Sequence, residues 1–418
     1  MKQANLNPRF GRGLRAQWQR LGEGVLGNAR YRRFLAARTL SNVGNGMGPI
    51  ALAFGVLGLP DGSPTALSVV LAAQAVPLVL TLPIAGVVAD RLGRARMIAI
   101  TDIALSAVVA IQGLLFITGH ASIPVLAVLA ALAGVLNGFW YPAFSGLVPD
   151  LVDEEHTQPA NAYISLGSNL GMILGSAVGG LIVSGWGAGT ALLIDATTFL
   201  LNGLLVWTLR VPPRPSTGDS VWQDFLHGWR VFTSYRWVVV IVGAFSVIVM
   251  VLEGAERVMG PVVADERYGG AAGWAAVMAT LSVGLLAGAY LGSRFTPQRP
   301  MVVGMICCLT LPAWLLTMAM GAPLLVVCAG ALLWGVAIEL FQVFWFTALH
   351  RNIPRDSLSR VASYDAMGSL MFGPLGLAFA GPLISAAGPT MAFGLAAAVA
   401  AVAILASLVA RSVRSLTA

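Results

Sequence analysis

Long apolar runs, each separated from the next by a short polar stretch, occupy almost the whole chain. About twelve of them are long enough to cross a bilayer as helices, which takes about 20 apolar residues each. They are residues 34–58, 65–89, 97–118, 123–147, 161–184, 188–209, 236–259, 273–294, 301–320, 323–348, 360–385 and 389–410. A membrane β-barrel needs alternating segments of about ten residues, whereas these runs are continuous. The pattern therefore predicts an all-α integral membrane protein with twelve transmembrane helices.

The composition agrees with this prediction. Of 418 residues, 57% are hydrophobic and only 10% are charged, unlike a soluble domain of this length. The net charge of +7 comes from arginine, since Lys2 is the only lysine. These arginines lie in short loops, as the positive-inside rule expects of a membrane protein, and we expect no nucleic-acid partner. Both termini are then cytoplasmic, in the cell inner (plasma) membrane.

A polar stretch rich in proline divides the twelve predicted helices into two sets of six. The expected organisation is a basic cytoplasmic segment over 1–33, a six-helix bundle over 34–209, a cytoplasmic linker over 210–235, a second bundle over 236–411 and a tail over 412–418. The two bundles echo each other: Leu147 through Tyr163 aligns with Leu349 through Tyr364. Paired six-helix halves suit alternating access to a site at the middle of the membrane.

The turn between the second and third spans carries the densest charge. Its sequence, GVVADRLGRAR, contains Gly86, Asp90, Arg91, Gly93, Arg94 and Arg96. This spacing resembles the signature loop of the major facilitator superfamily, whose members are secondary transporters. The resemblance implies that the halves rock about a central cavity. It also implies that Asp90 is a conformational latch against the amino end of span eleven, near Arg360.

The fifth span carries small residues at intervals of about four, at Gly171, Gly175, Gly179 and Gly180. Small residues at this spacing let helices approach closely. The pattern resembles the antiporter signature of the superfamily's exporters, with Ser176 in place of a proline. Further segments, among them Asp195-Ala196-Thr197-Thr198-Phe199, resemble the macrolide-efflux and siderophore-exporter branch.

Acidic residues inside apolar runs are costly and are therefore candidates for function. The candidates for proton coupling are Glu339, Glu256, Glu253, Asp102, Asp195 and Asp365. Glu253 precedes Arg257 by four residues, a spacing that favours a helical ion pair. Asp102 and Asp365 are also expected to cap helices or pair with loop arginines. Glu256 and Glu339 have no helical basic partner, so we expect one of these two to couple protons.

Spans one, four, seven and ten line the cavity in the superfamily. The resemblance therefore implies that the substrate meets Asn45, Asn137, Phe139, Trp140, Tyr141, Glu256, Glu339, Phe341 and Trp345. Aromatic residues also build membrane-interface belts and helix cores, so a purely structural role stays open for each.

The sequence contains no phosphate-binding loop with the Gly-Lys-Ser/Thr ending, and its four histidines are isolated near span ends. We therefore expect no cofactor, no metal and no enzymatic activity, with the proton motive force as the energy source. The predicted function is export of amphipathic or hydrophobic, antibiotic-like molecules by a monomer in the lipid bilayer. A siderophore exporter of the same fold and a lipid flippase or scramblase are the alternatives.

Reporter fusions test the predicted topology. Fusions after Ser216, in the linker, and after Ala418 are expected to report a cytoplasmic location, because arginine-rich segments are retained on that side. An external signal from either fusion contradicts the twelve-span arrangement.

Overall fold

The computed structural model describes residues 25–153, 156–209, 211, 229–295, 297–354, 361, 364–365, 367–369 and 371–416, with backbone alone at residues 83, 86, 87, 90, 145, 146, 149 and 158. Within these ranges every regular element is helical. The elements are α2 (Ala29–Leu57), α3 (Pro64–Leu92), α4 (Arg94–Ile117), α5 (Ile123–Leu151), α6 (Thr157–Trp186), α7 (Ala188–Trp207), α9 (Arg236–Gly254), η2 (Ala255–Met259), α10 (Gly260–Arg267), α11 (Ala271–Gly292), α12 (Pro300–Cys307), α13 (Thr310–Ala319), α14 (Leu324–Asn352), α16 (Gly373–Val409) and α17 (Arg411–Arg414).

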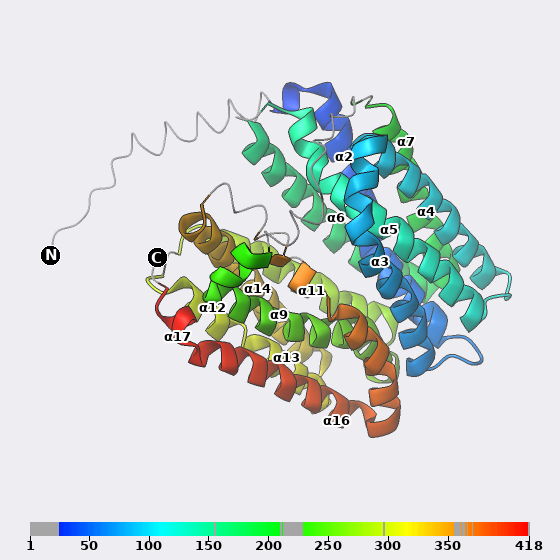
Figure 1. Ribbon diagram of the computed structural model, residues 1–418. Coiled ribbons are helices and arrows are strands. Elements are labelled where there is room, and N and C mark those ends of the chain that lie inside the picture. Colours follow the sequence, from blue (N-terminus) through cyan, green and yellow to red (C-terminus); the bar gives the residue numbers. More distant parts are fainter. Residues whose placement is uncertain are drawn as a thin grey trace, which may run out of the picture.

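The described residues contain eleven helical segments long and apolar enough to cross a membrane. The last of them, Met367–Val409, includes both of the last two predicted spans. Gly388 separates the two, because its φ of 75° and ψ of 166° are not helical and favour glycine, and Pro389 follows it. Figure 1 shows α16 turning sharply between its two parts. The prediction of an all-α integral membrane protein is confirmed.

The first helix begins earlier than the sequence pattern suggested. Asn28 caps α2, since its side-chain oxygen accepts hydrogen bonds from the backbone N–H groups of Arg30 and Tyr31 at 3.0 and 3.3 Å. Residues 29–33, assigned to a cytoplasmic segment from their charge, therefore belong to α2. Residues 1–24 and most of the linker lie outside the described ranges.

Two groups of helices form the molecule, α2 to α7 and α9 to α16 (Figure 1). They meet mainly along two helix pairs, α3 with α16 and α6 with α11. Figure 1 shows the groups close together at one end and diverging toward the other. The turn at Gly93 lies at the diverging end. Gly93, with a φ of 87°, joins α3 directly to α4. The closed end carries the loop before α3.

Backbone-to-backbone packing holds the closed end together. The Gly381 N–H of α16 donates a 2.7 Å hydrogen bond to the Ser68 hydroxyl of α3. One turn away, the hydroxyl oxygens of Thr65 and Ser385 lie 3.3 Å apart. A methyl group at Gly381 would collide with the Pro64 carbonyl oxygen. The approach of α3 and α16 at this end therefore depends on a glycine.

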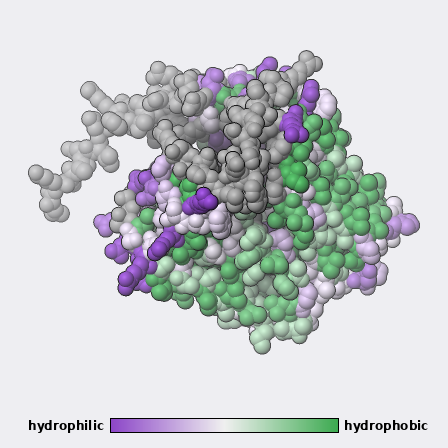
Figure 2. Space-filling model, in the orientation of Figure 1, coloured by the Kyte–Doolittle hydropathy of each residue, from purple (hydrophilic) through white to green (hydrophobic). Residues whose placement is uncertain are grey.

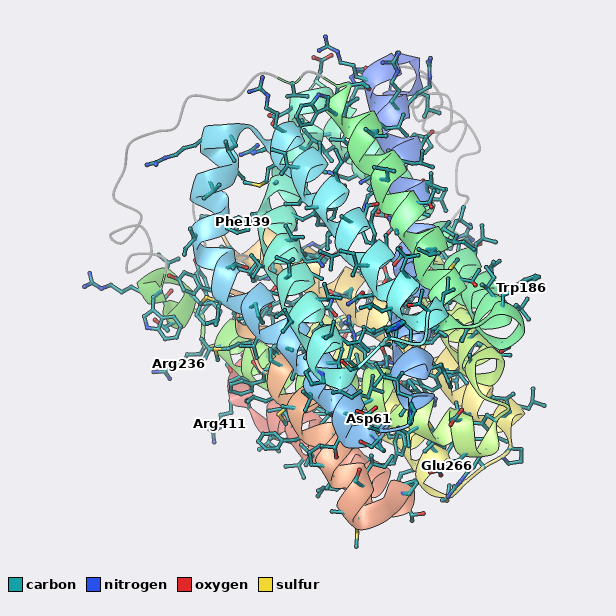
Figure 3. The ribbon with its side chains drawn as sticks, turned by 90° about the vertical axis from the view of Figure 1, so that its right-hand side faces the viewer. Asp61, Phe139, Trp186, Arg236, Glu266 and Arg411 are labelled. Atoms are coloured by element: carbon teal, nitrogen blue, oxygen red, sulfur yellow. The ribbon has the colours of Figure 1, made fainter. Side chains whose placement is uncertain are left out.

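The outer surface of the bundle is apolar. Large hydrophobic side chains are exposed on several helices, including Leu80, Val128, Leu181 and Phe379. Figure 2 shows hydrophobic areas over the right and lower parts of one face. In Figure 3, Arg236 and Arg411 lie at the left of the molecule, whereas Trp186 and Glu266 lie at the right. Such an apolar surface is that of a protein embedded in lipid.

Replacing Gly381 by alanine is expected to weaken closure at this end. Overpacking costs about 1–3 kcal/mol, and the middle of that range lowers the ratio of the closed to the open form by more than about tenfold. Cysteines at Thr65 and Ser385, in a background without native cysteines, should form an oxidative cross-link rapidly, and Gly381→Ala should slow it. Gly394→Ala is the matched control, because a methyl group there meets no atom within 4 Å. Equal cross-linking rates in the two variants contradict the role assigned to Gly381.

Candidate functional site

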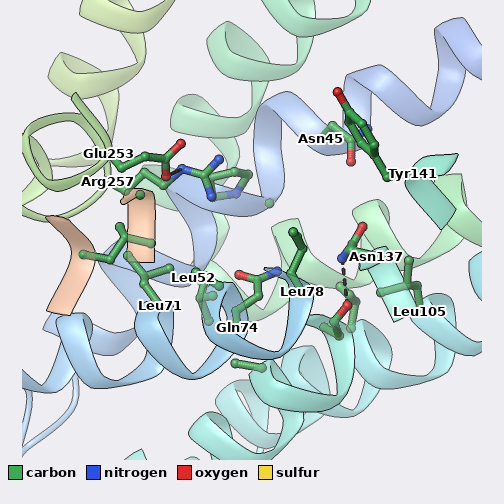
Figure 4. A pocket seen from close by; sticks show the side chains of 18 of the residues that line it. Asn45, Leu52, Leu71, Gln74, Leu78, Leu105, Asn137, Tyr141, Glu253 and Arg257 are labelled. Atoms are coloured by element: carbon green, nitrogen blue, oxygen red, sulfur yellow. Dashed lines mark hydrogen bonds and ion pairs between the residues drawn. The ribbon is translucent and has the colours of Figure 1, made fainter. Parts of the chain in front are cut away.

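A cavity of about 520 Å³ lies between the two groups of helices. The first group supplies most of its wall, through all of its helices from α2 to α7, and α9, η2 and α16 close the opposite side. Aliphatic side chains such as Leu71, Leu78 and Leu105 cover much of the wall (Figure 4). The cavity is thus suited to a largely apolar ligand that carries a few polar groups.

Neutral polar side chains are interspersed among the apolar side chains of this wall. Asn45, Asn137 and Tyr141 line the cavity where the sequence predicted them, and their role in binding stays a prediction. The Asn137 amide N–H donates to the Ala133 carbonyl of its own helix at 2.9 Å (Figure 4). Sequence reasoning missed three amides that also line the cavity, Asn42, Gln74 and Gln112. The sequence did contain a signal for them, since each is an amide side chain within an apolar run.

The other predicted cavity aromatics lie elsewhere. Phe341 and Trp345 are only 2% and 3% exposed, in the core of the second group of helices. Phe341 stacks on Phe245 with ring centres 4.3 Å apart, and Trp345 meets Trp237 edge-on at 5.4 Å. These contacts join α9 to α14, so both side chains are core residues in this conformation.

Phe139 and Trp140 also lie outside the described cavity lining. Phe139 packs against a buried cluster that includes Tyr31 and Leu147. Trp140 stacks on Phe144 with ring centres 4.8 Å apart. The Arg38 guanidinium lies 4.5 Å from the centres of both of these rings, a cation–π arrangement. The aromatic pair therefore accommodates a membrane arginine.

The fold gives the six candidate acids different surroundings. Glu339 lies on the face of α14 that packs against α11, since a methyl group at Gly288 would come within 2.8 Å of the Glu339 Cβ. Glu256 is half-buried on η2. Both were expected to line the cavity, but neither belongs to its described lining. Asp195 and Glu253 do line the cavity.

Asp195 is a buried acid, only 4% exposed, at the wall between α7 and α2. Its carboxylate lies against Gly44 and Gly48 of α2, where a methyl group at Gly48 would approach one oxygen to 2.5 Å. The Thr198 hydroxyl donates a long hydrogen bond of 3.5 Å to the other oxygen. Among the described residues Asp195 forms no ion pair. The two glycines thus let a carboxylate lie against a helix backbone beside the cavity.

Asp102 is buried in a polar network within the first group of helices. Its carboxylate accepts a short hydrogen bond from the Asn202 amide of α7. Trp140 of α5 also donates to it, and Arg38 of α2 provides a favourable charge nearby. Asp102 therefore joins four helices, and its partners are membrane residues rather than the loop arginines that the sequence suggested.

Asp365 is satisfied in a similar way in the second group. It accepts a 2.8 Å hydrogen bond from the Trp345 indole N–H and a 3.3 Å bond from the Ser369 hydroxyl. Two donors to one half-buried carboxylate indicate a structural role.

The arginine-rich turn is partly described. Arg94, at the start of α4, forms an ion pair with Asp150 near the end of α5, with an N–O distance of 3.4 Å. Arg91 and Arg96 are exposed. The latch predicted for Asp90 is a contact between its side chain and the amino end of span eleven near Arg360, and both the Asp90 side chain and Arg360 lie outside the described part of the chain. That prediction stays open.

The glycine stripe of α6 faces two different neighbours. Gly171, Gly175 and Gly179 lie against α2, and a methyl group at Gly171 would approach the Thr39 carbonyl oxygen to 2.7 Å. Gly180 instead lies against Ala271 and Ala275 of α11, in the other group of helices. The stripe therefore serves both packing within one half and contact between halves.

Comparison with known proteins agrees with the fold. The family model described as Major Facilitator Superfamily matches residues 34–369. The chain is 29% identical over 376 residues to a protein of Mycolicibacterium fortuitum named multidrug efflux pump Tap, covering 85% of this chain and 89% of the relative.

Two further comparisons are more distant or more partial. A staphyloferrin A transporter of Staphylococcus aureus is 30% identical over 173 residues, which is 41% of this chain and 43% of the relative. A crystal structure of the nucleoside transporter NupG superposes with a TM-score of 0.70 at 14% identity, covering 91% of this chain and 98% of that one. At that identity the likeness concerns the fold alone.

Substitution of Asn202 by alanine is expected to destabilise the first group of helices by about 1–3 kcal/mol, because the buried Asp102 carboxylate loses a donor. Thermal unfolding of the purified protein in detergent measures the loss. Asn352→Ala is the control, since Asn352 donates only to the Ala348 carbonyl of its own helix, at 2.9 Å. An Asn202→Ala protein as stable as the Asn352→Ala protein contradicts the structural role of the network.

Proposed function

The chain belongs to the Major Facilitator Superfamily, and on that premise we propose that it is a secondary active exporter of amphipathic or hydrophobic small molecules, driven by protons moving inward. The observation that carries the proposal is the cavity between the two halves, with its aliphatic wall, its neutral amides and its buried acid. The relative from Mycolicibacterium fortuitum, which is named a multidrug efflux pump and aligns over most of both chains, supports the same reading.

We further propose that the protein works as a monomer in the cell inner membrane with both termini in the cytoplasm. On this orientation the end where the halves diverge faces the cytoplasm, because it carries the arginine-rich turn. The closed end, with the Ser68–Gly381 contact, then faces outward. This is the arrangement in which an exporter collects its substrate.

Asp195 is the acid best placed to couple protons to export. It lines the cavity, whereas Asp102 and Asp365 are occupied by hydrogen-bond donors and Glu339 faces another helix. Burial favours the protonated form of a carboxyl group, and a cation in the same cavity favours the ionised form. Competition between proton and substrate is sufficient for exchange, because the binding of each disfavours the other.

Uptake into inside-out vesicles tests both parts of the proposal. With an acidic interior, vesicles containing the protein should accumulate a cationic dye such as ethidium. Asp195→Asn should abolish accumulation driven by the gradient while keeping dye exchange without a gradient. Asparagine has the shape of aspartate and fits beside Gly44 and Gly48, and Glu339→Gln serves as the matched control.

Three results argue against the proposal. If the unmodified protein accumulates no compound from a broad panel, the exporter assignment fails. If Asp195→Asn retains gradient-driven uptake, the coupling group is another acid. If Glu339→Gln loses gradient-driven uptake while Asp195→Asn does not, the coupling acid is Glu339, one of the two acids predicted from the sequence.

Siderophore export is the second candidate, because the staphyloferrin A transporter of Staphylococcus aureus matches part of the chain. The cavity supports it less, since its described lining contains two carboxylates and a single guanidinium, a poor environment for a polyanion. Growth with and without the gene, across a drug panel and under iron limitation, distinguishes the two. Drug sensitivity of the deletion strain favours drug export, and impaired growth only under iron limitation favours siderophore export.

A further inference from the structure

The second half contributes one ion pair to the cavity wall. The Nε of Arg257 lies 2.9 Å from a carboxylate oxygen of Glu253, four residues earlier in the chain. Both residues line the cavity (Figure 4). The Arg257 side chain is 46% exposed and the Glu253 side chain 27% exposed, so the cavity reaches both. The ion pair predicted from the helical spacing is confirmed. Its location in the cavity wall places both charges within reach of a ligand.

The two partners differ in how firmly the fold holds them. Glu253 lies at the contact between α9 and α16, where a methyl group at Gly373 would meet its Cγ at 3.5 Å. The adjacent Gly254 lies against the Gly376 carbonyl oxygen of α16. Arg257 instead stands on the π-helical turn η2, a type of turn frequent at functional sites. Glu253 is thus the fixed partner, and Arg257 is the long, exposed partner that can move away.

Breaking this pair costs little. Half-exposed ion pairs contribute little to stability because water competes for both charges. Among the described residues, the Nε group is the only part of the Arg257 guanidinium with a bonded partner. The remaining N–H groups can be hydrated in the cavity, so Arg257 can leave Glu253 without being buried unpaired.

The charges of the cavity favour a cationic ligand over an anionic one. The described lining contains two carboxylates, Asp195 and Glu253, and one guanidinium, and its other polar groups are neutral amides and a phenol. An anion bound at Arg257 would share the cavity with both carboxylates. A cation at Glu253 would be attracted by both.

We propose that Glu253 binds the cationic group of the exported molecule and that Arg257 is a tethered competitor for the same carboxylate. In the empty cavity Arg257 neutralises Glu253. A hydrophobic cation displaces it, since burial of its apolar body against the leucine wall adds to the attraction. When the cavity rearranges, Arg257 returns to Glu253 and favours release. This inference rests on the proposed export function and specifies its substrate class as hydrophobic organic cations.

Equilibrium binding to the purified full-length protein in detergent tests the inference without any ion gradient. The probes are tetraphenylphosphonium, a permanent cation, and triphenylphosphine oxide, a neutral molecule with similar aryl groups. Arg257→Gln should tighten binding of the cation by about five- to tenfold, because its competitor is gone. Glu253→Gln should weaken binding of the cation by about tenfold or more. Neither change should alter binding of the neutral probe by more than about twofold, which also shows that the cavity is intact.

The inference is overturned if Arg257→Gln weakens binding of the cation, or if Glu253→Gln leaves it unchanged. Tighter binding of an anionic probe such as tetraphenylborate to the unmodified protein, lost in Arg257→Gln, identifies an anion site and overturns it as well. Glu339→Gln is the matched control, being an acid of the same half outside the described lining. These outcomes are independent of vesicle uptake, so a failure of gradient-driven export and a failure of this site are distinguishable.

Discussion

Hydrocarbon offers no hydrogen-bond partner, so every polar group within the membrane must be satisfied by the protein or by a water-filled cavity. Helices meet this requirement for the backbone, and the same requirement explains where the side chains lie. Asp102 is surrounded by donors from two other helices, and Asp365 by an indole and a hydroxyl. Asp195 and the Glu253–Arg257 pair lie instead at the cavity, where water or a ligand can reach them.

Close helix packing is the second consequence of this environment. Without a hydrophobic driving force between helices, contact area has to come from small residues that let backbones approach. Glycines of α6 lie against α2, while Gly180 and Gly381 lie against helices of the opposite half. The contacts between halves are therefore concentrated in two helix pairs, α3 with α16 and α6 with α11. Such contacts can separate and reform as units, which alternating access requires.

The cavity combines these two consequences. Its wall is largely aliphatic, and its polar groups are amides, a phenol, one isolated acid and one ion pair. Asp195 reaches it over two glycines, and the Glu253–Arg257 pair enters it from a π-helical turn. The cavity thus has two places where a charged ligand can bind. One is the Asp195 carboxylate, which forms no ion pair among the described residues, and the other is the weak ion pair between Glu253 and Arg257.

The sequence by itself determined the features that depend on local periodicity. Span length, the division at the linker, the arginine-rich turn and the ion pair between Glu253 and Arg257 each follow from spacing along one helix or one loop. The first helix was expected to begin at residue 34 but begins at Ala29, because the cap at Asn28 and the charges of Arg30, Arg32 and Arg33 give opposing signals.

Only the tertiary structure decided which acid faces the cavity. Glu339 and Asp195 are alike in sequence, each an isolated acid within an apolar run. Their difference lies in their neighbours: α11 covers the first, and two glycines of α2 admit the second to the cavity wall. The amides Asn42, Gln74 and Gln112 were missed for the same reason. Whether a side chain faces the cavity or a neighbouring helix is decided only by how the helices pack against one another.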